Sequence, residues 1–360
     1  MLSHHQIAAA TRIGMLTRER DTVSACAQAL EELGRALPLD VATLLSIDPL
    51  TGEHVQVAGI GYTAENSQAM AAEFVDTPWY RNVVRQDVPP SISEDADDPG
   101  QRFRHGWFYA ERVRPAGLRD AMTGALRHDG RLVGLINLST RDADAYDTEA
   151  RLLLASVIPA LGALVDPTAH TGDLHGLPAE GAASLVAEGG SVDLPGRERA
   201  RVAADEEFRP LLRAFAGTGG RRLRLLWPLD GTWYRVSLHR HTTAPGLTGP
   251  AEAVLVHETP TELPYGLSPR ELEVLTRAAT GQTNQAIAQA LFLSPRTVHS
   301  HIEHLLRKTG AASRAEATAL AVRDGLLRPA PDHLDHFVER SDPSQGSTGR
   351  PTSGNLRPPH

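Results

Sequence analysis

Four helix-start signals lie close together between residues 267 and 327, and they strongly restrict how this segment can fold. Each signal places a hydroxyl side chain where it can accept a hydrogen bond from the first free backbone N–H groups of a helix. The first and last also carry a glutamate three residues on, which completes a capping box. The segment is therefore predicted to form four short helices joined by tight turns. The signals are Ser268-Pro269-Arg270-Glu271, Thr283-Asn284, Ser294-Pro295 and Ser313-Arg314-Ala315-Glu316.

The third of these helices, from Pro295 to about Lys308, has one apolar and one polar face when its residues are projected at about 100° each. A short helix, a tight turn and a second helix with a free polar face form the arrangement by which a helix-turn-helix presents side chains to base edges and amides to phosphate. The pattern therefore predicts binding of duplex DNA. The apolar face holds Val298, Ile302, Leu305 and Leu306, and the polar face holds Arg296, Thr297, His299, Ser300, Glu303, His304 and Arg307.

Three runs of sequence resemble the LuxR-type helix-turn-helix family, namely residues 267–275, 281–288 and 293–301. The similarity continues through Arg307-Lys308-Thr309-Gly310 and Arg314-Ala315-Glu316-Ala317. The resemblance implies an all-α, four-helix DNA-binding domain at residues 261–328. It also implies that the protein is a transcriptional regulator that recognises specific sequences in duplex DNA.

The same resemblance assigns roles to individual positions. The base-reading positions of the family fall on His299, Ser300 and Glu303, although lysine is commoner than histidine at the first of them. Glutamate repels phosphate but can accept a hydrogen bond from cytosine N4, so we expect an unusual base preference. The backbone-contacting positions fall on Asn284, Thr297, His301 and Lys308. The full expected DNA-contacting set is Asn284, Ser294, Arg296, Thr297, His299, Ser300, His301, Glu303, His304, Arg307 and Lys308.

Several of these residues have a second interpretation. His299, His301 and His304 could suggest a metal site, but no acidic or cysteine ligand is fixed beside them, so no metal is predicted. Lys308 could be a solvated cation at a helix end, where the helix dipole favours it. The helix-turn-helix could also be a protein-binding remnant.

The charge balance predicts modest electrostatic binding. Residues 267–327 carry seven basic and five acidic side chains, while the whole chain has a net charge of −8. A weakly basic module on an acidic chain should have a modest affinity for non-specific DNA and a modest salt dependence. A homodimer formed through the helix at 314–324, where the family usually pairs, would double the contacts. RNA polymerase is a further candidate partner of a regulator of this type.

The N-terminal half alternates helices with strand pairs. A helix is predicted over residues 6–37 and another over 148–165. Between them, strands at 41–47 and 54–60 flank a loop containing Pro49 and Gly52, and a second hairpin at 120–140 turns at Asp129-Gly130. Residues 63–110 are predicted to be irregular and aromatic.

This order resembles the GAF domain, a small α+β sensory fold with an antiparallel sheet backed by helices. The most specific match is the run 129–138, followed by 147–153, which is similar to the closing strands and last helix of that family. The resemblance covers residues 6–165 and implies a GAF-like sensory domain at residues 1–165.

Aromatic residues concentrate in the part of this domain where GAF domains bind ligands. They predict an aromatic-lined pocket for a small molecule of unknown identity, or alternatively a core beneath a long loop. Cys26 is predicted to be a buried apolar residue, and the spacing of His54, His105 and His128 favours no haem, so no cofactor is predicted. The candidate pocket residues are Phe74, Trp79, Tyr80, Phe103, Trp107, Phe108 and Tyr109.

The remaining segments are a linker, a connector and a tail. Residues 166–180 read as a linker rich in proline, glycine, threonine and histidine. Residues 181–260 are predicted to form a small α+β connector, either PAS-like or a structured spacer without a ligand. Its expected elements are a hairpin at 183–194, a helix at 205–216 and strands at 221–227, 233–239 and 252–257. Residues 329–360 are rich in proline and poor in apolar side chains, so they are predicted to be disordered.

Composition argues against most enzymes. The chain has one cysteine and one lysine, Lys308, and contains neither a phosphate-binding GxxxxGK[ST] motif nor a GxSxG motif. It also shows no signal peptide or membrane span, so a cytoplasmic, non-enzymatic protein is predicted. The sequence as a whole predicts a DNA-binding transcriptional regulator controlled by a sensory domain. The alternative is an interaction module whose GAF-like half binds a protein partner and no small molecule.

Overall fold

The computed structural model describes residues 3–19, 21–94, 102–169, 171, 175–188, 190–241 and 253–340, and the chain divides into two compact units. The first unit comprises Met1–Arg201 and His241–His257, and the second comprises Val202–Arg240 and Glu258–His360. Two of the three borders, at 240/241 and 257/258, fall within strands, and a separate middle domain at 181–260 stays a prediction. A PAS-like fold for that region stays a prediction.

A four-stranded antiparallel sheet lies at the centre of the first unit, with the strand order β2-β1-β4-β3. Both predicted hairpins are confirmed. Asp129 and Gly130 connect β3 to β4 with φ angles of 47° and 75°, as a two-residue turn matched to the twist of its strands requires. The strands are β1 (Val41–Ile47), β2 (His54–Ile60), β3 (Asp120–His128) and β4 (Arg131–Thr140).

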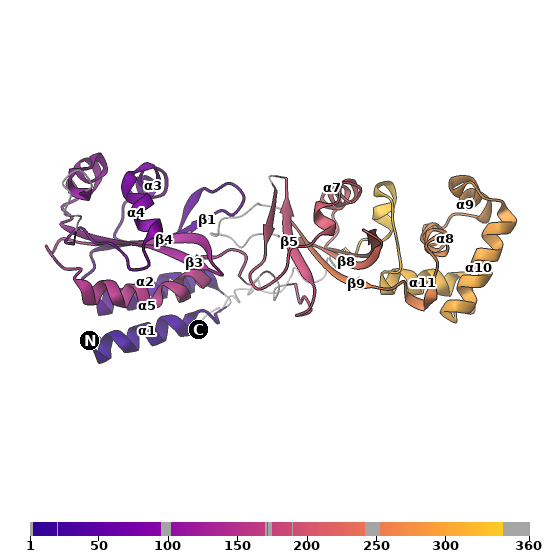
Figure 1. Cartoon of the computed structure of the whole chain (residues 1–360), viewed down its shortest axis with the longest axis horizontal. Coiled ribbons are helices and arrows are strands. Elements are labelled where there is room, and N and C mark those ends of the chain that lie inside the picture. The colour runs from indigo at the N-terminus through magenta and orange to yellow at the C-terminus, as the bar shows by residue number, and fades with distance from the viewer. Residues whose placement is uncertain are drawn as a thin grey trace, which may run out of the picture. The chain divides into compact units, whose positions relative to one another are not determined.

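Helices α1 (His4–Leu16), α2 (Thr22–Ala36) and α5 (Thr148–Val165) form one side of this unit. In Figure 1, α2 and α5 lie beneath the sheet and α1 lies outside them, and their apolar residues share one buried cluster with the sheet. The sequence predicts a single helix over 6–37, but the structure has two, because Asp21 accepts a hydrogen bond from Ser24 N–H and starts α2. By length and composition, α5 is the one helix of the described residues that could cross a membrane, but its buried side chains belong to this core.

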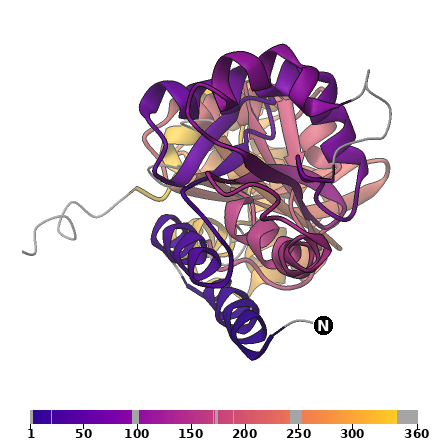
Figure 2. The ribbon, with the colours of Figure 1, turned by 90° about the vertical axis from the view of Figure 1, so that its left-hand side faces the viewer.

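The other face of the sheet is covered by short helices, which Figure 2 shows above it. The sequence predicts irregular structure over 63–110, whereas Thr63 and Thr77 each cap a helix by accepting a backbone N–H. Residues 95–101 lie outside the described residues. The elements on this face are α3 (Ala64–Ala72), η1 (Phe74–Asp76), α4 (Pro78–Arg85), η3 (Phe103–His105) and η4 (Tyr109–Val113).

Three further strands belong largely to the first unit, in the order β6-β5-β9. They are β5 (Ala182–Ala187), β6 (Gly190–Asp193) and β9 (Ala253–Thr261), of which the first two form the predicted hairpin. The linker that precedes β5 is anchored at its first residue, Asp166. The buried carboxylate of Asp166 accepts hydrogen bonds from His128, Arg131 and Thr168. Residues 170 and 172–174 of the predicted linker lie outside the described residues. Gly189 of the predicted hairpin and Glu252 of the predicted strand at 252–257 also lie outside them.

The second unit begins with a helix and an antiparallel strand pair. These are η5 (Val202–Ala204), α7 (Arg209–Gly217), β7 (Arg222–Leu229) and β8 (Thr232–His241), with the end of β9 beside β8. The Trp227 indole donates a hydrogen bond of 2.8 Å to Asp205 and stacks edge-on against Phe208, which fixes the start of α7 against β7.

Four helices complete the second unit and begin where the sequence predicts them. They follow η6 (Pro264–Gly266) and are α8 (Pro269–Ala279), α9 (Asn284–Leu291), α10 (Pro295–Thr309) and α11 (Arg314–Asp324). Apolar residues from all four are buried between them, among them Leu272, Leu275, Ile287, Val298, Leu305 and Ala321.

Residues 329–340 differ from the predicted disorder. They contain η7 (Pro331–His336), and Leu334 and Phe337 are buried. Glu339 pairs with β7 through two backbone hydrogen bonds, from Arg221 N–H and to the Arg222 carbonyl. Packing against an edge strand therefore orders a segment whose own composition is too polar to do so. The rest of the predicted tail, 341–360, lies outside the described residues.

Candidate nucleic-acid interface

Hydroxyl caps start the two helices of the helix-turn-helix. The Thr283 hydroxyl accepts the Ala286 N–H at 3.2 Å, and the Ser294 hydroxyl accepts the Thr297 N–H at 3.0 Å. The Ser294 and Thr297 hydroxyls also lie 2.8 Å apart. Both side chains of this pair are exposed, so the N-terminus of α10 presents hydroxyl and amide groups to solvent.

The helices α8 and α11 are capped differently from each other. Ser268 and Glu271 form the complete predicted box, in which each side chain accepts the backbone N–H of the other residue. At α11, Ser313 accepts the Glu316 N–H, but the Glu316 carboxylate accepts from Ala312 N–H instead. The predicted second box is therefore only half formed.

The two faces of α10 are arranged as the sequence predicts. Val298, Ile302 and Leu305 are buried in the domain core. His301 is half-buried at the border between the faces. The exposed arc is made of Arg296, Thr297, His299, Ser300, Glu303, His304 and Arg307.

Two histidines on this arc lie close to glutamate side chains. His299 Nε2 lies 3.4 Å from Glu303 Oε1, one helical turn away, and both side chains are 63% exposed. His304 Nδ1 lies 4.0 Å from Glu271 Oε1. The histidines therefore face different partners, and the described residues contain no group of three or more side chains able to hold a metal ion.

Lys308 is paired with other residues of the domain, although its side chain remains 31% exposed. Its Nζ donates hydrogen bonds of 2.6 Å to Glu271 Oε2 and 2.8 Å to the Gly266 carbonyl. Burial alone would raise the pKa of Glu271, but hydrogen bonds from Lys308 and Ser268 outweigh it and lower the pKa below its ordinary value. The lysine thus holds the end of α10 against the capping box of α8.

Arg314 performs a similar task at the start of α9. One of its nitrogens donates to Asn284 Oδ1 at 3.0 Å, and another donates to the Gln282 carbonyl. Arginine can satisfy both acceptors at once because its guanidinium is a planar fork of N–H donors. Asn284, expected to contact the DNA backbone, is therefore held by the first residue of α11.

Few cations on these helices remain directed outward. Arg270 donates to Glu273 at 2.6 Å and to the Leu291 carbonyl at 2.5 Å, which leaves it occupied within the domain. On α10, Arg296 and Arg307 are exposed. The phosphate-binding charge of the surface is thus smaller than the number of basic residues suggests.

Four of the predicted aromatic pocket residues line a small cavity in the first unit. Phe74, Trp79, Phe103 and Phe108 surround a space of about 20 Å³. The Phe74 and Phe108 ring centroids are 5.4 Å apart, and those of Trp79 and Phe103 are 5.2 Å apart. The rings fill the interior so closely that only a single water would fit.

The other three predicted pocket residues lie outside the cavity wall. Tyr80 is half-buried with its hydroxyl 3.4 Å from His54 Nε2, Trp107 is 46% exposed, and Tyr109 packs at the border of the aromatic cluster. The predicted pocket set is therefore only partly brought together.

One wall of the cavity is polar. The Tyr62 hydroxyl donates to Asn137 Oδ1 at 2.6 Å, Ser139 Oγ donates to the same oxygen at 3.0 Å, and Asn137 Nδ2 donates to Thr123 at 2.9 Å. Burial raises the pKa of Tyr62 to about 12, so its hydroxyl stays protonated. The cavity thus offers a single hydrogen-bonding end among aromatic rings.

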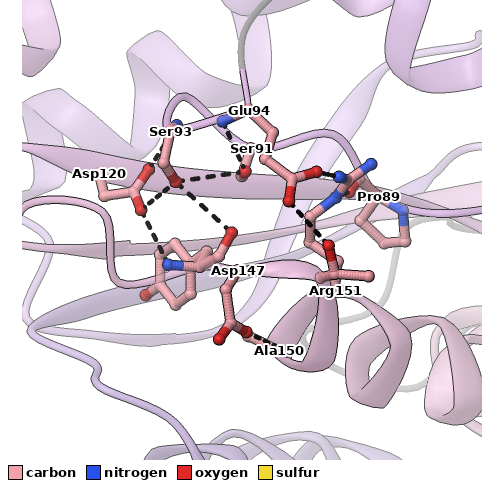
Figure 3. A network of polar contacts seen from close by, with 10 residues as sticks. Pro89, Ser91, Ser93, Glu94, Asp120, Asp147, Ala150 and Arg151 are labelled. Atoms are coloured by element: carbon pink, nitrogen blue, oxygen red, sulfur yellow. Dashed lines mark hydrogen bonds and ion pairs between the residues drawn. The ribbon is translucent and has the colours of Figure 1, made fainter.

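Figure 3 shows the polar network that fixes the segment carrying Ile92, another residue of the cavity wall. The buried Asp120 carboxylate accepts four hydrogen bonds, two from Ser93, one from Ala121 N–H and one from Tyr146 N–H. Close by, Glu94 pairs with Arg151 of α5, which donates to the Pro89 carbonyl at 2.7 Å. These contacts tie residues 89–94 to both β3 and α5.

Comparison with known proteins identifies two families. Residues 266–321 match the family described as bacterial regulatory proteins, luxR family, and residues 21–163 match the GAF domain family. The chain carries a GAF domain and a LuxR-family DNA-binding domain.

Similar curated proteins match a short part of the chain. A probable transcriptional regulatory protein NarL of Mycobacterium tuberculosis is 41% identical over 88 residues, which is 24% of this chain and 40% of that protein. The uncharacterized transcriptional regulatory protein YhcZ of Bacillus subtilis is 43% identical over 70 residues, or 19% of this chain and 33% of that protein. The chain therefore spans two fifths or less of the length of these relatives.

Cys26 and the histidines of the GAF domain have ordinary structural surroundings. Burial raises the pKa of the Cys26 thiol to about 12, which leaves no reactive thiolate at neutral pH. His54 packs edge-on against Tyr80, and His128 bonds to Asp166.

Sequence reasoning missed the residues that hold the interface in place. The sequence predicts neither the contact of Arg314 with Asn284 nor that of Lys308 with Glu271, because these partners lie 30 and 37 residues away. In the GAF domain, the polar cavity wall was also missed. Alternating polar residues in β4, Asn137 and Ser139, were the available signal, since alternate residues of a strand face the same side.

Proposed function

We propose that this chain is a cytoplasmic transcriptional regulator without enzymatic activity, whose LuxR-family domain binds specific sites in duplex DNA. The observation that carries this proposal is the continuous exposed polar arc of α10, which starts at a hydroxyl-capped N-terminus and is backed by buried apolar residues. A recognition helix needs these two faces to enter the major groove while remaining anchored.

The exposed residues of α10 and its cap have two different roles in binding DNA. His299, Ser300 and Glu303 face base edges, and the Glu303 carboxylate suits the amino group of cytosine. Ser294, Thr297 and the neighbouring cations contact the sugar-phosphate backbone. The cations are Arg296 and Arg307, with His301 and His304 at the edges of the contact. Lys308 and Asn284 contribute mainly by fixing the positions of α10 and α9.

The regulator acts as a homodimer that pairs through α11. Ala315, Ala319 and Val322 share one exposed side of this helix, at the spacing of neighbours on one helical face. Two copies would place two recognition helices on one site and double the phosphate contacts. RNA polymerase is the further partner through which such a regulator acts.

The GAF domain controls this binding through a small, mostly aromatic or aliphatic ligand with one hydrogen-bonding group. The aromatic rings around Phe74 and the polar wall at Tyr62 and Asn137 support this class of ligand. Since the cavity holds only about 20 Å³, ligand binding must be accompanied by outward movement of the rings. The alternative is that the GAF domain binds a protein partner and no small molecule.

Selection of bound duplexes from a random pool tests the DNA-binding proposal. The full-length protein is expected to enrich an inverted repeat with half-sites one helical turn apart. The Glu303→Ala variant is expected to lose preference at one base pair in each half-site, while Glu262→Ala, at an exposed position before η6, retains it. No enrichment by the wild-type protein at low salt would contradict the proposal.

Ligand screening by thermal shift tests the sensory role. Small aromatic compounds are expected to raise the unfolding temperature of the wild-type protein but not that of Ala121→Trp, because Ala121 lines the cavity and the larger side chain would fill it. Protein capture without any small-molecule response would favour the alternative.

A further inference from the structure

Phe292 ends α9 in a backbone conformation that glycine adopts most easily. Its φ and ψ angles are 56° and 45°, in the left-handed region. Its N–H bonds back to the carbonyls of Ala288 and Gln289, and the next N–H, of Leu293, bonds to Ala288 at 2.8 Å. This hydrogen-bonding pattern requires a left-handed residue, and a side chain there is strained.

The other helix ends of the same domain use glycine for this purpose. Gly281, Gly310 and Gly325 follow α8, α10 and α11 with φ angles of 82°, 72° and 67°. Phe292 is therefore the position at which the domain departs from the residue that best suits its own folding.

The phenyl ring brings no packing that would offset this strain, because the residue is 96% exposed. Among the described residues of α8, α9, α10 and their turns, it is the one large apolar side chain exposed to solvent. Protein-binding hot spots lie within larger apolar patches, so a lone ring is a poor centre for a protein interface. A residue that breaks a local folding rule without improving the packing is expected to serve a function, such as contact with another molecule.

The position of the ring indicates its partner. Phe292 lies two residues before Ser294, the cap of α10, and four before the exposed cation Arg296. The ring therefore precedes the exposed N-terminus of α10 by a single short turn, next to the proposed phosphate-binding groups. We propose that Phe292 packs against the deoxyribose of the DNA backbone beside the groove entered by α10, as an apolar contact that positions the helix. This inference rests on the proposed DNA-binding function.

Such a contact has a distinctive signature. Deoxyribose is the same for every base, so the contact strengthens binding to specific and non-specific duplexes alike. It displaces no counterions, so it leaves the salt dependence of binding unchanged, unlike an arginine-phosphate contact.

The test compares Phe292→Gly and Arg296→Ala in the full-length protein, with the selected operator and a random duplex of equal length. We expect Phe292→Gly to bind both duplexes about tenfold more weakly, with an unchanged slope of log affinity against log salt. Its thermal unfolding temperature should stay the same or rise, because glycine relieves the strain. Arg296→Ala should weaken binding and also reduce the slope.

Several results would overturn the inference. Unchanged affinity of Phe292→Gly, while the wild-type protein binds its operator, removes the DNA contact and leaves the DNA-binding function standing. Unchanged affinity with loss of transcription by RNA polymerase would assign the ring to a protein partner. If glycine lowers the unfolding temperature, Phe292→Asn decides, since asparagine tolerates the left-handed conformation; normal affinity of that variant overturns the proposal. Failure of the wild-type protein to bind any duplex instead overturns the function itself.

Discussion

The helices of the LuxR-family domain and the helical segment of the GAF domain between residues 63 and 113 are stabilised in different ways. In the first, each helix starts at a hydroxyl cap, and left-handed residues mark the ends. In the second, Thr63 and Thr77 also cap α3 and α4, but the rings of Phe74 and Trp79, from η1 and α4, pack onto a sheet beside a segment held by the distant Asp120. Local signals therefore determine the DNA-binding helices, whereas long-range packing and one buried carboxylate determine the cavity wall.

The strongest test of this contrast is Asp120→Ala. The substitution leaves the donors of Ser93, Ala121 and Tyr146 without their shared acceptor, and we expect it to lower the free energy of unfolding of the GAF domain by about 4 kcal/mol. Urea unfolding followed by tryptophan fluorescence measures this. Asp142→Ala, at an exposed position, is the control and should change little. A stable Asp120→Ala protein would show that packing alone holds the wall.

Lys308→Met should destabilise the DNA-binding domain by about 2 kcal/mol, because it leaves the Glu271 carboxylate buried without its cation. The pKa of Glu271 is lowered in the folded protein. Its contribution to stability is therefore present above the ordinary pKa and is lost as the pH falls through the folded value.

Thermal unfolding as a function of pH tests this prediction. Wild-type stability should fall in acid more steeply than that of Lys308→Met, and Arg307→Met should behave like the wild type. Equal acid sensitivity of the wild type and Lys308→Met would contradict the assigned role of the lysine.

The substitution Arg314→Lys tests whether a contact between distant residues also matters in the DNA-binding domain. Lysine cannot donate to Asn284 and to the Gln282 carbonyl with the fork geometry of arginine, so α9 loses one anchor. We expect operator affinity to fall about fivefold with little change in unfolding temperature, as for one lost charge-assisted hydrogen bond. Fluorescence anisotropy measures the affinity, and Arg323→Lys, whose arginine pairs with Asp324, is the matched control. A result identical to the control would make Arg314 dispensable for binding.

The smallest expected effect concerns salt. Since Arg296 and Arg307 are the exposed cations of α10 that, unlike Lys308, are not paired with Glu271, a dimer should neutralise about four phosphates, giving a slope of log affinity against log salt of about −4. Titrations at several salt concentrations measure the slope. A much steeper slope would mean that the internally paired cations turn outward on DNA.

Local sequence was sufficient for elements whose boundaries carry their own signals. The start of each DNA-binding helix, both hairpins of the GAF sheet and α5 were predicted from caps, turn residues and periodicity. The sequence does not predict the GAF helices α3 and α4, although Thr63 and Thr77-Pro78 are cap signals. The aromatic residues that follow these caps do not form a clear helical pattern.

Contacts between distant residues could not be predicted in this way. Composition predicts disorder beyond residue 328, but Leu334 and Phe337 find a buried environment, and Glu339 finds the free edge of β7. The roles of Lys308 and Arg314 likewise depend on which acceptors the fold brings near, and neither acceptor is visible in the neighbouring sequence.

The pairing of Lys308 has a practical consequence for chemical labelling. The chain contains no other lysine, and this amine donates hydrogen bonds to a carboxylate and to a carbonyl oxygen. Reagents that acylate amines must break both hydrogen bonds to reach the nitrogen, so they should modify Lys308 of the folded protein slowly. Labelling of Lys308 would then report that α10 has separated from α8, which makes the sole lysine a built-in probe for opening of the DNA-binding domain.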